Sequence, residues 1–244
     1  SVLLAGVLLK MGGYGILRIC VGLFPDVAYQ WAPTLAALAG FSVLYGGLVT
    51  LRQRDLKRLI AYSSVSHMGY VLLGVAAMGE VGITGAALQM VTHGTITGLL
   101  FAAVGLIYDK AHTRQIPELQ GLMHRMPFIG VAFMVAGFAS LGLPGLSGFV
   151  AEFMVFTGAF GVFGFATVLG VLGIVLSAAY ILWTAQRSLF QTLPHRWEHL
   201  TDAVGVERVP LVVLMAVILL IGLFPAIVTD VIKAGIMPIV GRLG

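Results

Sequence analysis

The sequence predicts an all-α membrane protein, a polytopic bundle of about seven transmembrane helices. Of its 244 residues, 59% are hydrophobic and only 10% are charged, whereas about 25% of the residues in a soluble domain are charged. A spanning helix needs about 20 apolar residues, and apolar runs of this length recur along the whole chain. This composition excludes a cytosolic enzyme, a disordered linker and a nucleic-acid-binding module.

Polar residues, prolines and glycines set the limits of the predicted helices. Pro25 and Pro33 bracket a first loop, the polar segment 52–55 ends the second helix, and Gly79–Glu80 separates the third helix from the fourth. The segment 127–186 carries one charge and has a length that fits two crossings, one of them longer than usual. The predicted spans are 1–24, 32–51, 59–79, 83–108, 127–158, 163–187 and 209–230.

The basic residues are distributed unevenly between the two sides of such a bundle. Seven crossings place the loops 52–58, 109–126 and 187–208 on one side, and the loop 25–31 and the tail 231–244 on the other. The first side carries Arg52, Arg54, Lys57, Arg58, Lys110, Arg114, Arg125, Arg187, Arg196 and Arg208, and the second carries Lys233 and Arg242. Cytoplasmic loops are enriched in Lys and Arg, so we expect the basic loops to be cytoplasmic. The net charge of +4 then needs no nucleic-acid partner.

The chain starts at Ser1 inside an apolar run, without an initiator Met or the charged start of a signal peptide. We therefore expect residues 1–244 to form a single transmembrane domain that is the C-terminal part of a longer membrane protein.

Two ionisable residues lie well inside predicted helices, where a charge at the bilayer centre costs about 3 kcal/mol or more. Lys10 stands among apolar residues about 13 Å from Ser1 along a helix, near the middle of a core about 30 Å thick. Glu152 follows a cluster of Gly and Pro at 143–148 that cannot continue a regular helix. Transporters build sites at such broken helices. The alternatives are that Lys10 snorkels to an interface and that the break is a kink formed for packing.

His67 and His93 lie at a similar predicted depth on two further helices, about 13–17 Å from the helix starts. Histidine titrates near neutral pH, and Ser and Thr residues beside each histidine offer hydrogen-bond partners. A structural role for the histidines, and helix packing for the Ser and Thr residues, are the alternatives. Together, Lys10, His67, His93 and Glu152 predict a row of titratable groups across the membrane, which is typical of a proton relay and not of a ligand pocket.

We expect no redox cofactor and no metal ion on this chain. The sequence has no cluster of His, Cys, Asp and Glu with metal-ligand spacing, and no P-loop, dinucleotide fingerprint or nucleophile elbow. The single cysteine, Cys20, excludes a disulfide framework and a cysteine-ligated iron–sulfur cluster, which needs several thiolates.

Three segments resemble the antiporter-like subunits of respiratory complex I, a family of proton-conducting membrane transporters. They are residues 8–15 (LLKMGGYG), 55–69 (DLKRLIAYSSVSHMG) and 143–153 (LPGLSGFVAEF). The resemblance covers essentially the whole chain. It favours the subunit M (chain 4) type, because that type carries Glu in its second broken helix where its relatives carry Lys.

The resemblance implies a fold of fourteen helices with two inverted five-helix repeats, each with one broken helix, of which this chain has the last seven helices. It implies that Lys10 is the lysine connecting two half-channels. His67 and His93 would belong to the central hydrophilic axis, and Glu152 would be the distal proton-carrying residue.

The implied function is that of a proton-translocating membrane-arm subunit of NADH-quinone oxidoreductase, in the inner (plasma) membrane of a prokaryote. NAD, FMN, iron–sulfur clusters and quinone would bind to partner subunits, where electron transfer takes place. The implied partners are other membrane-arm subunits, neighbouring antiporter-like subunits among them, and the lipid bilayer.

Two other functions stay open at this point. The same motifs occur in subunits of cation (Na⁺)/proton antiporter complexes and of membrane-bound hydrogenases. A purely structural spacer in the membrane arm is the second alternative, although such a spacer would gain stability if leucine replaced Lys10 and Glu152.

Overall fold

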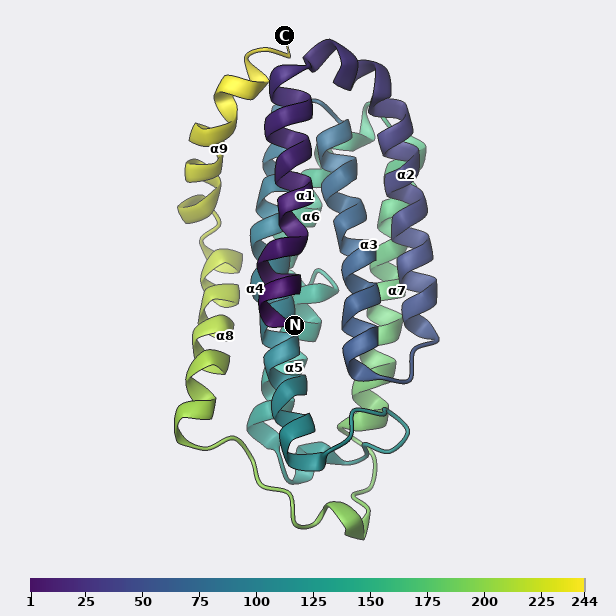
Figure 1. Ribbon diagram of the computed structural model, residues 1–244, viewed down its shortest axis with the longest axis vertical. Coiled ribbons are helices and arrows are strands. Elements are labelled where there is room, and N and C mark those ends of the chain that lie inside the picture. Colours follow the sequence, from purple (N-terminus) through teal and green to yellow (C-terminus); the bar gives the residue numbers. More distant parts are fainter. Residues whose placement is uncertain (244) are drawn as a thin grey trace.

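The computed structural model describes residues 1–243 as a bundle of long helices that run along one axis (Figure 1). Six helices in this part of the chain are long and apolar enough to cross a membrane. They are Leu4–Val21, which contains α1 (Leu9–Gly15), α2 (Pro25–Leu51), α3 (Leu56–Ala76), α4 (Glu80–Ala111), α7 (Gly164–Ser188) and Gly205–Leu223, which contains α8 (Arg208–Leu223). The predicted all-α transmembrane bundle is confirmed.

The predicted span 127–158 consists of two shorter apolar helices, α5 (Pro127–Ser140) and α6 (Ser147–Phe160). The break between them lies at 141–146, which agrees with the break predicted near 143–148. The two helices together make the seventh crossing, because each alone is shorter than the about 20 residues that a crossing requires.

The prediction of a loop at 25–31 is wrong, because α2 begins at Pro25. Proline suits the first position of a helix, where its missing N–H needs no partner. Pro33 lies inside α2 on an exposed position, so its ring does not disturb the packed face of the helix.

The limits predicted for the last span are also wrong. The helix α8 ends at Leu223, and α9 (Ala226–Val240) occupies most of the predicted tail 231–244. Phe224 leaves the helical conformation at the end of α8, with φ −128° and ψ 64°. Pro225 lacks the N–H that would continue the hydrogen-bond ladder of α8. Lys233 of α9 lies 3.7 Å from Glu80 at the start of α4.

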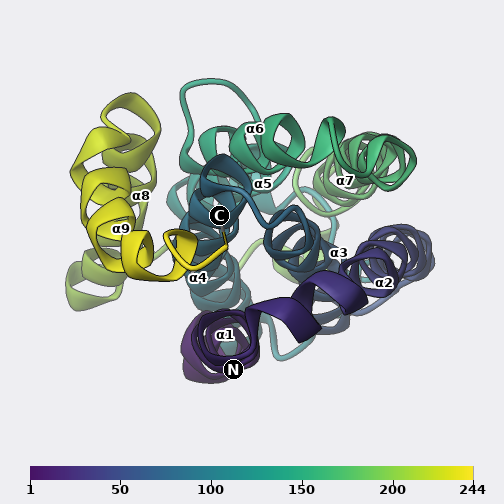
Figure 2. The ribbon, with the colours of Figure 1, turned by 90° about the horizontal axis from the view of Figure 1, so that it is seen from above.

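The helix α4 lies in the centre of the bundle, as the view from above shows (Figure 2). It packs against α3, α5, α6, α8 and α9, whereas α2 and α7 pack together on the far side of α3 (Figure 2). Most side chains of α3 and α4 are buried. These two helices carry His67 and His93, so the protein itself surrounds both histidines.

The loops at 52–55, 112–126 and 189–207 lie at one end of the bundle, and the turns at 22–24, 77–79 and 161–163 lie at the other (Figure 1). Short 3₁₀ turns occur in the first set of loops, at Leu122–His124, His195–Trp197 and Gly205–Glu207. The structure thus gathers the predicted basic loops at one end. That this end faces the cytoplasm stays a prediction.

Asp55 organises the basic end where α3 begins. Its carboxylate caps α3 by accepting hydrogen bonds from the backbone N–H groups of Lys57 (2.8 Å) and Arg58 (3.0 Å), and it pairs with Arg114 Nε at 2.6 Å. An isolated antiparallel bridge joins Asp55 to Gln115. One buried acid therefore satisfies the helix terminus and fixes the loop that follows α4.

Candidate proton-relay site

The break between α5 and α6 has a defined backbone structure that its sequence explains. At the end of α5, the N–H of Leu143 donates to the carbonyl oxygen of Phe138 (3.0 Å) and the N–H of Gly142 donates to that of Ala139 (3.3 Å). With φ +73° at Gly142, this is the Schellman motif, which ends helices at a left-handed glycine.

A tight turn follows at once. Pro144 and Gly145 occupy its two central positions, and the N–H of Leu146 donates to the carbonyl oxygen of Leu143 at 3.1 Å. Gly145 has φ +90°, as the third residue of a type II turn requires. The Gly-Leu-Pro-Gly segment therefore stops one helix and starts the next within six residues, at membrane depth.

Glu152 lies in the second turn of α6, with its carboxyl group directed at α3 and back at the break. Its Oε1 lies 3.5 Å from His67 Nδ1. A Cβ atom built on Gly142 would lie 2.5 Å from Glu152 Oε2, so any larger residue there would push the carboxyl group away from this position. The break and the carboxyl group thus fit together at one point.

His67 has hydrogen-bonding groups on both sides of its ring. Its Nε2 lies 3.0 Å from Ser140 Oγ, at the end of α5, and 3.4 Å from the hydroxyl of Tyr180 on α7. Tyr180 in turn donates to Ser177 Oγ at 3.1 Å. Histidine can hold a proton on either ring nitrogen, so His67 can connect the carboxyl group of Glu152 to the hydroxyl groups of α5 and α7.

His93 stands beside His67, with their ring centroids 5.4 Å apart and the rings tilted by 47°. Among the described residues, neither ring nitrogen of His93 has a hydrogen-bond partner, and the same holds for Glu152 Oε2 and for three further buried atoms. These are Tyr70 Oη, Gln89 Oε1 and Ser147 Oγ. Buried polar groups in proteins nearly always have a partner, ordered water included.

Lys10 lies on the first helix, where that helix meets α4. A Cβ on Gly94 would lie 2.8 Å from the carbonyl oxygen of Gly6 and 3.9 Å from Lys10 Cε, so the two glycines allow the helices to approach beside the lysine. The Lys10 ammonium donates to the carbonyl oxygen of Ala5, within the wider π-helical segment Leu4–Leu8. Such π-segments occur mostly within α-helices and frequently at functional sites.

All four residues predicted for the relay are buried. Their exposed fractions are 8% for Lys10, 3% for His67, 2% for His93 and 3% for Glu152. The order in space is Lys10 on the first helix, His93 on α4, His67 on α3 and Glu152 on α6. The low exposure of Lys10 argues against snorkelling to the surface of this bundle.

Several polar residues that contact or adjoin this row were not predicted from the sequence. Tyr180 and Ser177 occur three residues apart in an otherwise apolar helix, and this spacing places them on one face, so their pairing could have been predicted. No comparable spacing in the sequence points to Ser140 or Gln89. Helix packing alone brings Ser140 to His67 and buries Gln89.

Comparisons with known proteins agree with this architecture. The family model described as NADH:quinone oxidoreductase/Mrp antiporter, TM, matches residues 1–178. The chain belongs to this family. The resemblance to antiporter-like subunits that the motifs indicated is thereby confirmed.

Individual relatives show how much of a protein of this family the chain represents. NADH-quinone oxidoreductase subunit M of Rhodobacter capsulatus is 43% identical over 241 residues, which are 98% of this chain and 47% of the relative. F(420)H(2) dehydrogenase subunit M of Methanosarcina mazei is 42% identical over 226 residues, 92% of this chain and 46% of the relative. The chain thus spans about half the length of these relatives.

The fold is also that of a chain in a solved assembly. A subunit of respiratory complex I from Thermus thermophilus with bound NADH matches with a TM-score of 0.92 and 30% sequence identity. The match covers 97% of this chain and 50% of that subunit.

The fit between Gly142 and Glu152 can be tested by the substitution Gly142→Ala. A non-glycine residue with left-handed backbone angles costs about 1–2 kcal/mol, and the new Cβ would displace the carboxyl group of Glu152. We expect Gly142→Ala to lower the free energy of unfolding of the full-length subunit by about 2 kcal/mol, measured by thermal unfolding in detergent.

Gly161→Ala is the matched control, because Gly161 has a φ of −67° and a Cβ there would have open space. We expect a change within about 0.5 kcal/mol for this control. Equal stability of the two variants would contradict the fit described here.

Proposed function

We propose that the full-length subunit moves protons across the membrane as part of an NADH-quinone oxidoreductase. The observation that carries this proposal is the contact between His67 and Glu152 at the helix break, 3.5 Å apart and enclosed by protein. His93 and Lys10 extend this pair through the centre of the bundle. Four ionisable residues are costly to retain at membrane depth and mark ion or proton pathways.

The row can carry protons because each group alters the proton affinity of the next. Titratable sites in close contact do not titrate independently, so a charge arriving at Lys10 changes the protonation of His93, and this change reaches His67 and Glu152. We propose that water molecules near Gln89, Ser147 and Tyr70 complete the path, since polar atoms of these side chains are buried without a protein partner. Glu152 would then release the proton to the side opposite the basic loops.

The source of energy would lie on other subunits of the same complex. The sequence offers no set of ligands for a redox cofactor, so electron transfer from NADH through FMN and iron–sulfur clusters to quinone would take place on partner chains. The relatives support such an assembly, since they are named as subunits of NADH-quinone oxidoreductase and of F(420)H(2) dehydrogenase. We place the complex in the inner membrane of a prokaryote, with the basic loops in the cytoplasm.

The direct test is Glu152→Gln in membrane vesicles that carry the full-length subunit in its complex. Glutamine preserves the shape of the side chain and removes the proton-carrying group. We expect NADH-driven acidification of the vesicle interior to fall about tenfold or more, with quinone reduction falling as well, while the complex still assembles. Both rates are recorded on the same vesicles.

Glu198→Gln is the matched control, because Glu198 is exposed in the loop after α7. This loop lies at the basic end of the bundle and contains none of the relay residues. Its variant should keep wild-type rates. Unchanged acidification in Glu152→Gln would show that this half of the bundle is a scaffold, which is the spacer function considered above.

Lys10→Ala tests the other end of the row. Removal of the ammonium group interrupts the exchange of charge with His93, so we expect acidification to fall several-fold. Arg18→Ala, in the same membrane-spanning segment, is the control. Arg18 is exposed, and its guanidinium donates to the carbonyl oxygen of Gly235 at 3.5 Å, away from the relay residues. Equal rates for the wild type and Lys10→Ala would remove Lys10 from the relay.

A second candidate function is sodium/proton exchange, because the matching family includes Mrp antiporters. A membrane-bound hydrogenase that shares these motifs is a related candidate. Sodium extrusion driven by a pH gradient, without NADH, would favour the antiporter, and the loss of acidification on removal of NADH would favour the oxidoreductase.

A further inference from the structure

A second polar feature of the molecule lies at the basic end, apart from the relay. A cavity of about 240 Å³ opens between the end of α2, the loop after α4 and the last turns of α7. Its polar lining comes from Arg52, Gln53, Arg54, Thr184 and Arg187, and Trp183 adds an aromatic wall. Three separate segments of the chain thus meet around one small space.

The electrostatics of this cavity favour an anion. Three of its lining residues are arginines and none is acidic. Among residues 1–243, no ion pair engages Arg52, Arg54 or Arg187. Asp55 follows Arg54 directly, but Arg114 and the start of α3 occupy its carboxylate. Guanidinium groups in one cavity repel each other, and an anion between them would relieve this repulsion.

The shape and position of the lining specify the anion further. Arginine presents a planar fork of N–H donors that matches phosphate oxygens. Arg187 stacks over the ring of Trp183, with its Cζ 4.5 Å from the ring centroid, which holds the guanidinium at the cavity. Tryptophan is typical of the membrane–water interface, and Trp183 is 42% exposed at the end of a spanning helix.

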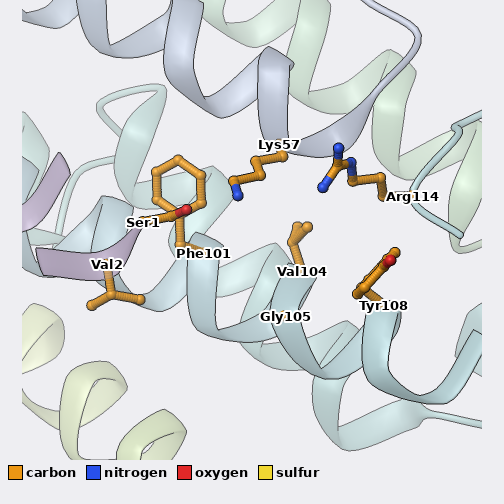
Figure 3. Close-up of a pocket in the computed structure, with 8 residues that line it drawn as sticks. All are labelled: Ser1, Val2, Lys57, Phe101, Val104, Gly105, Tyr108 and Arg114. Carbon is orange, nitrogen blue, oxygen red and sulfur yellow. The ribbon is translucent and has the colours of Figure 1, made fainter. Parts of the chain in front are cut away.

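A second cavity with basic side chains has a less suitable lining for an anion. Lys57 and Arg114 point into it, opposite Phe101, Val104 and Tyr108 of α4 (Figure 3). There Arg114 is already paired with Asp55, and apolar groups form most of the wall. The cavity around Arg187 is therefore the better anion site.

We propose that the cavity lined by Arg52, Arg54 and Arg187 binds a phosphate-bearing anion at the membrane surface. A lipid headgroup and free phosphate share this chemistry. The position beside Trp183 favours the headgroup of an anionic phospholipid, because basic pockets between spanning helices bind such headgroups. Binding there would hold the loop after α4 against α2 and α7.

The test is native mass spectrometry of the purified full-length subunit, titrated with phosphatidylglycerol, phosphatidylcholine or inorganic phosphate. We expect the first phosphatidylglycerol to bind more tightly than phosphatidylcholine. Arg187→Gln should weaken this first binding about fivefold, as expected for the loss of one cationic side chain near anionic lipid. Arg187→Lys should weaken it less, because lysine keeps the charge.

Arg58→Gln is the matched control, because Arg58 is exposed at the same end of the bundle and does not line the cavity. Arg54→Gln repeats the test from another segment in case the variant at 187 does not fold. If binding of inorganic phosphate, but not of phosphatidylglycerol, is weakened by the variants at Arg187 and Arg54, the anion site is confirmed with free phosphate as its ligand. If neither probe distinguishes these variants from Arg58→Gln, the proposal is wrong.

Discussion

The structure depends on one constraint, which is that a carboxyl group at membrane depth must be enclosed by protein and given a partner. Glu152 meets this requirement through the break between α5 and α6. The break leaves room for the carboxyl group at Gly142, and it ends α5 at Ser140, whose hydroxyl lies beside His67. The same few residues therefore interrupt the helix, make space for the acid and provide a partner for the histidine next to it.

The packing of α3, α4 and the first helix brings the other titratable residues to Glu152. His67 and His93 can stand side by side because α3 and α4 are neighbours in the middle of the bundle. The small residues Gly6 and Gly94 then admit the first helix close to α4, which brings Lys10 to the row. Membrane helices commonly pack closely where both carry small residues. Here this close packing sets the distance between Lys10 and the titratable groups of α4.

Much of this could be predicted from the sequence, because burial in a membrane imposes strong local signals. Runs of apolar residues predict the membrane-spanning helices, and Pro144 with the glycines around it predicts the helix break. Isolated charges within apolar segments identify Lys10 and Glu152 as candidate relay residues. Proline often marks the end of a helix, and this rule wrongly predicts a loop at 25–31. Pro25 instead begins α2, and Pro33 lies on an exposed position within it. The contacts of His67 with Ser140 and Tyr180 could not be predicted, since they depend on which helices pack together and at what rotation.

The central claim is that His67 and Glu152 act as one unit in proton transfer. A double-mutant cycle tests it most directly, with NADH-driven acidification measured in vesicles for His67→Asn, Glu152→Gln and the two combined. If the residues act as a unit, the double variant should lose about as much activity as the more damaging single variant, because either change already breaks the path. Losses that multiply in the double variant would contradict the account, since they would mean that the two residues act independently.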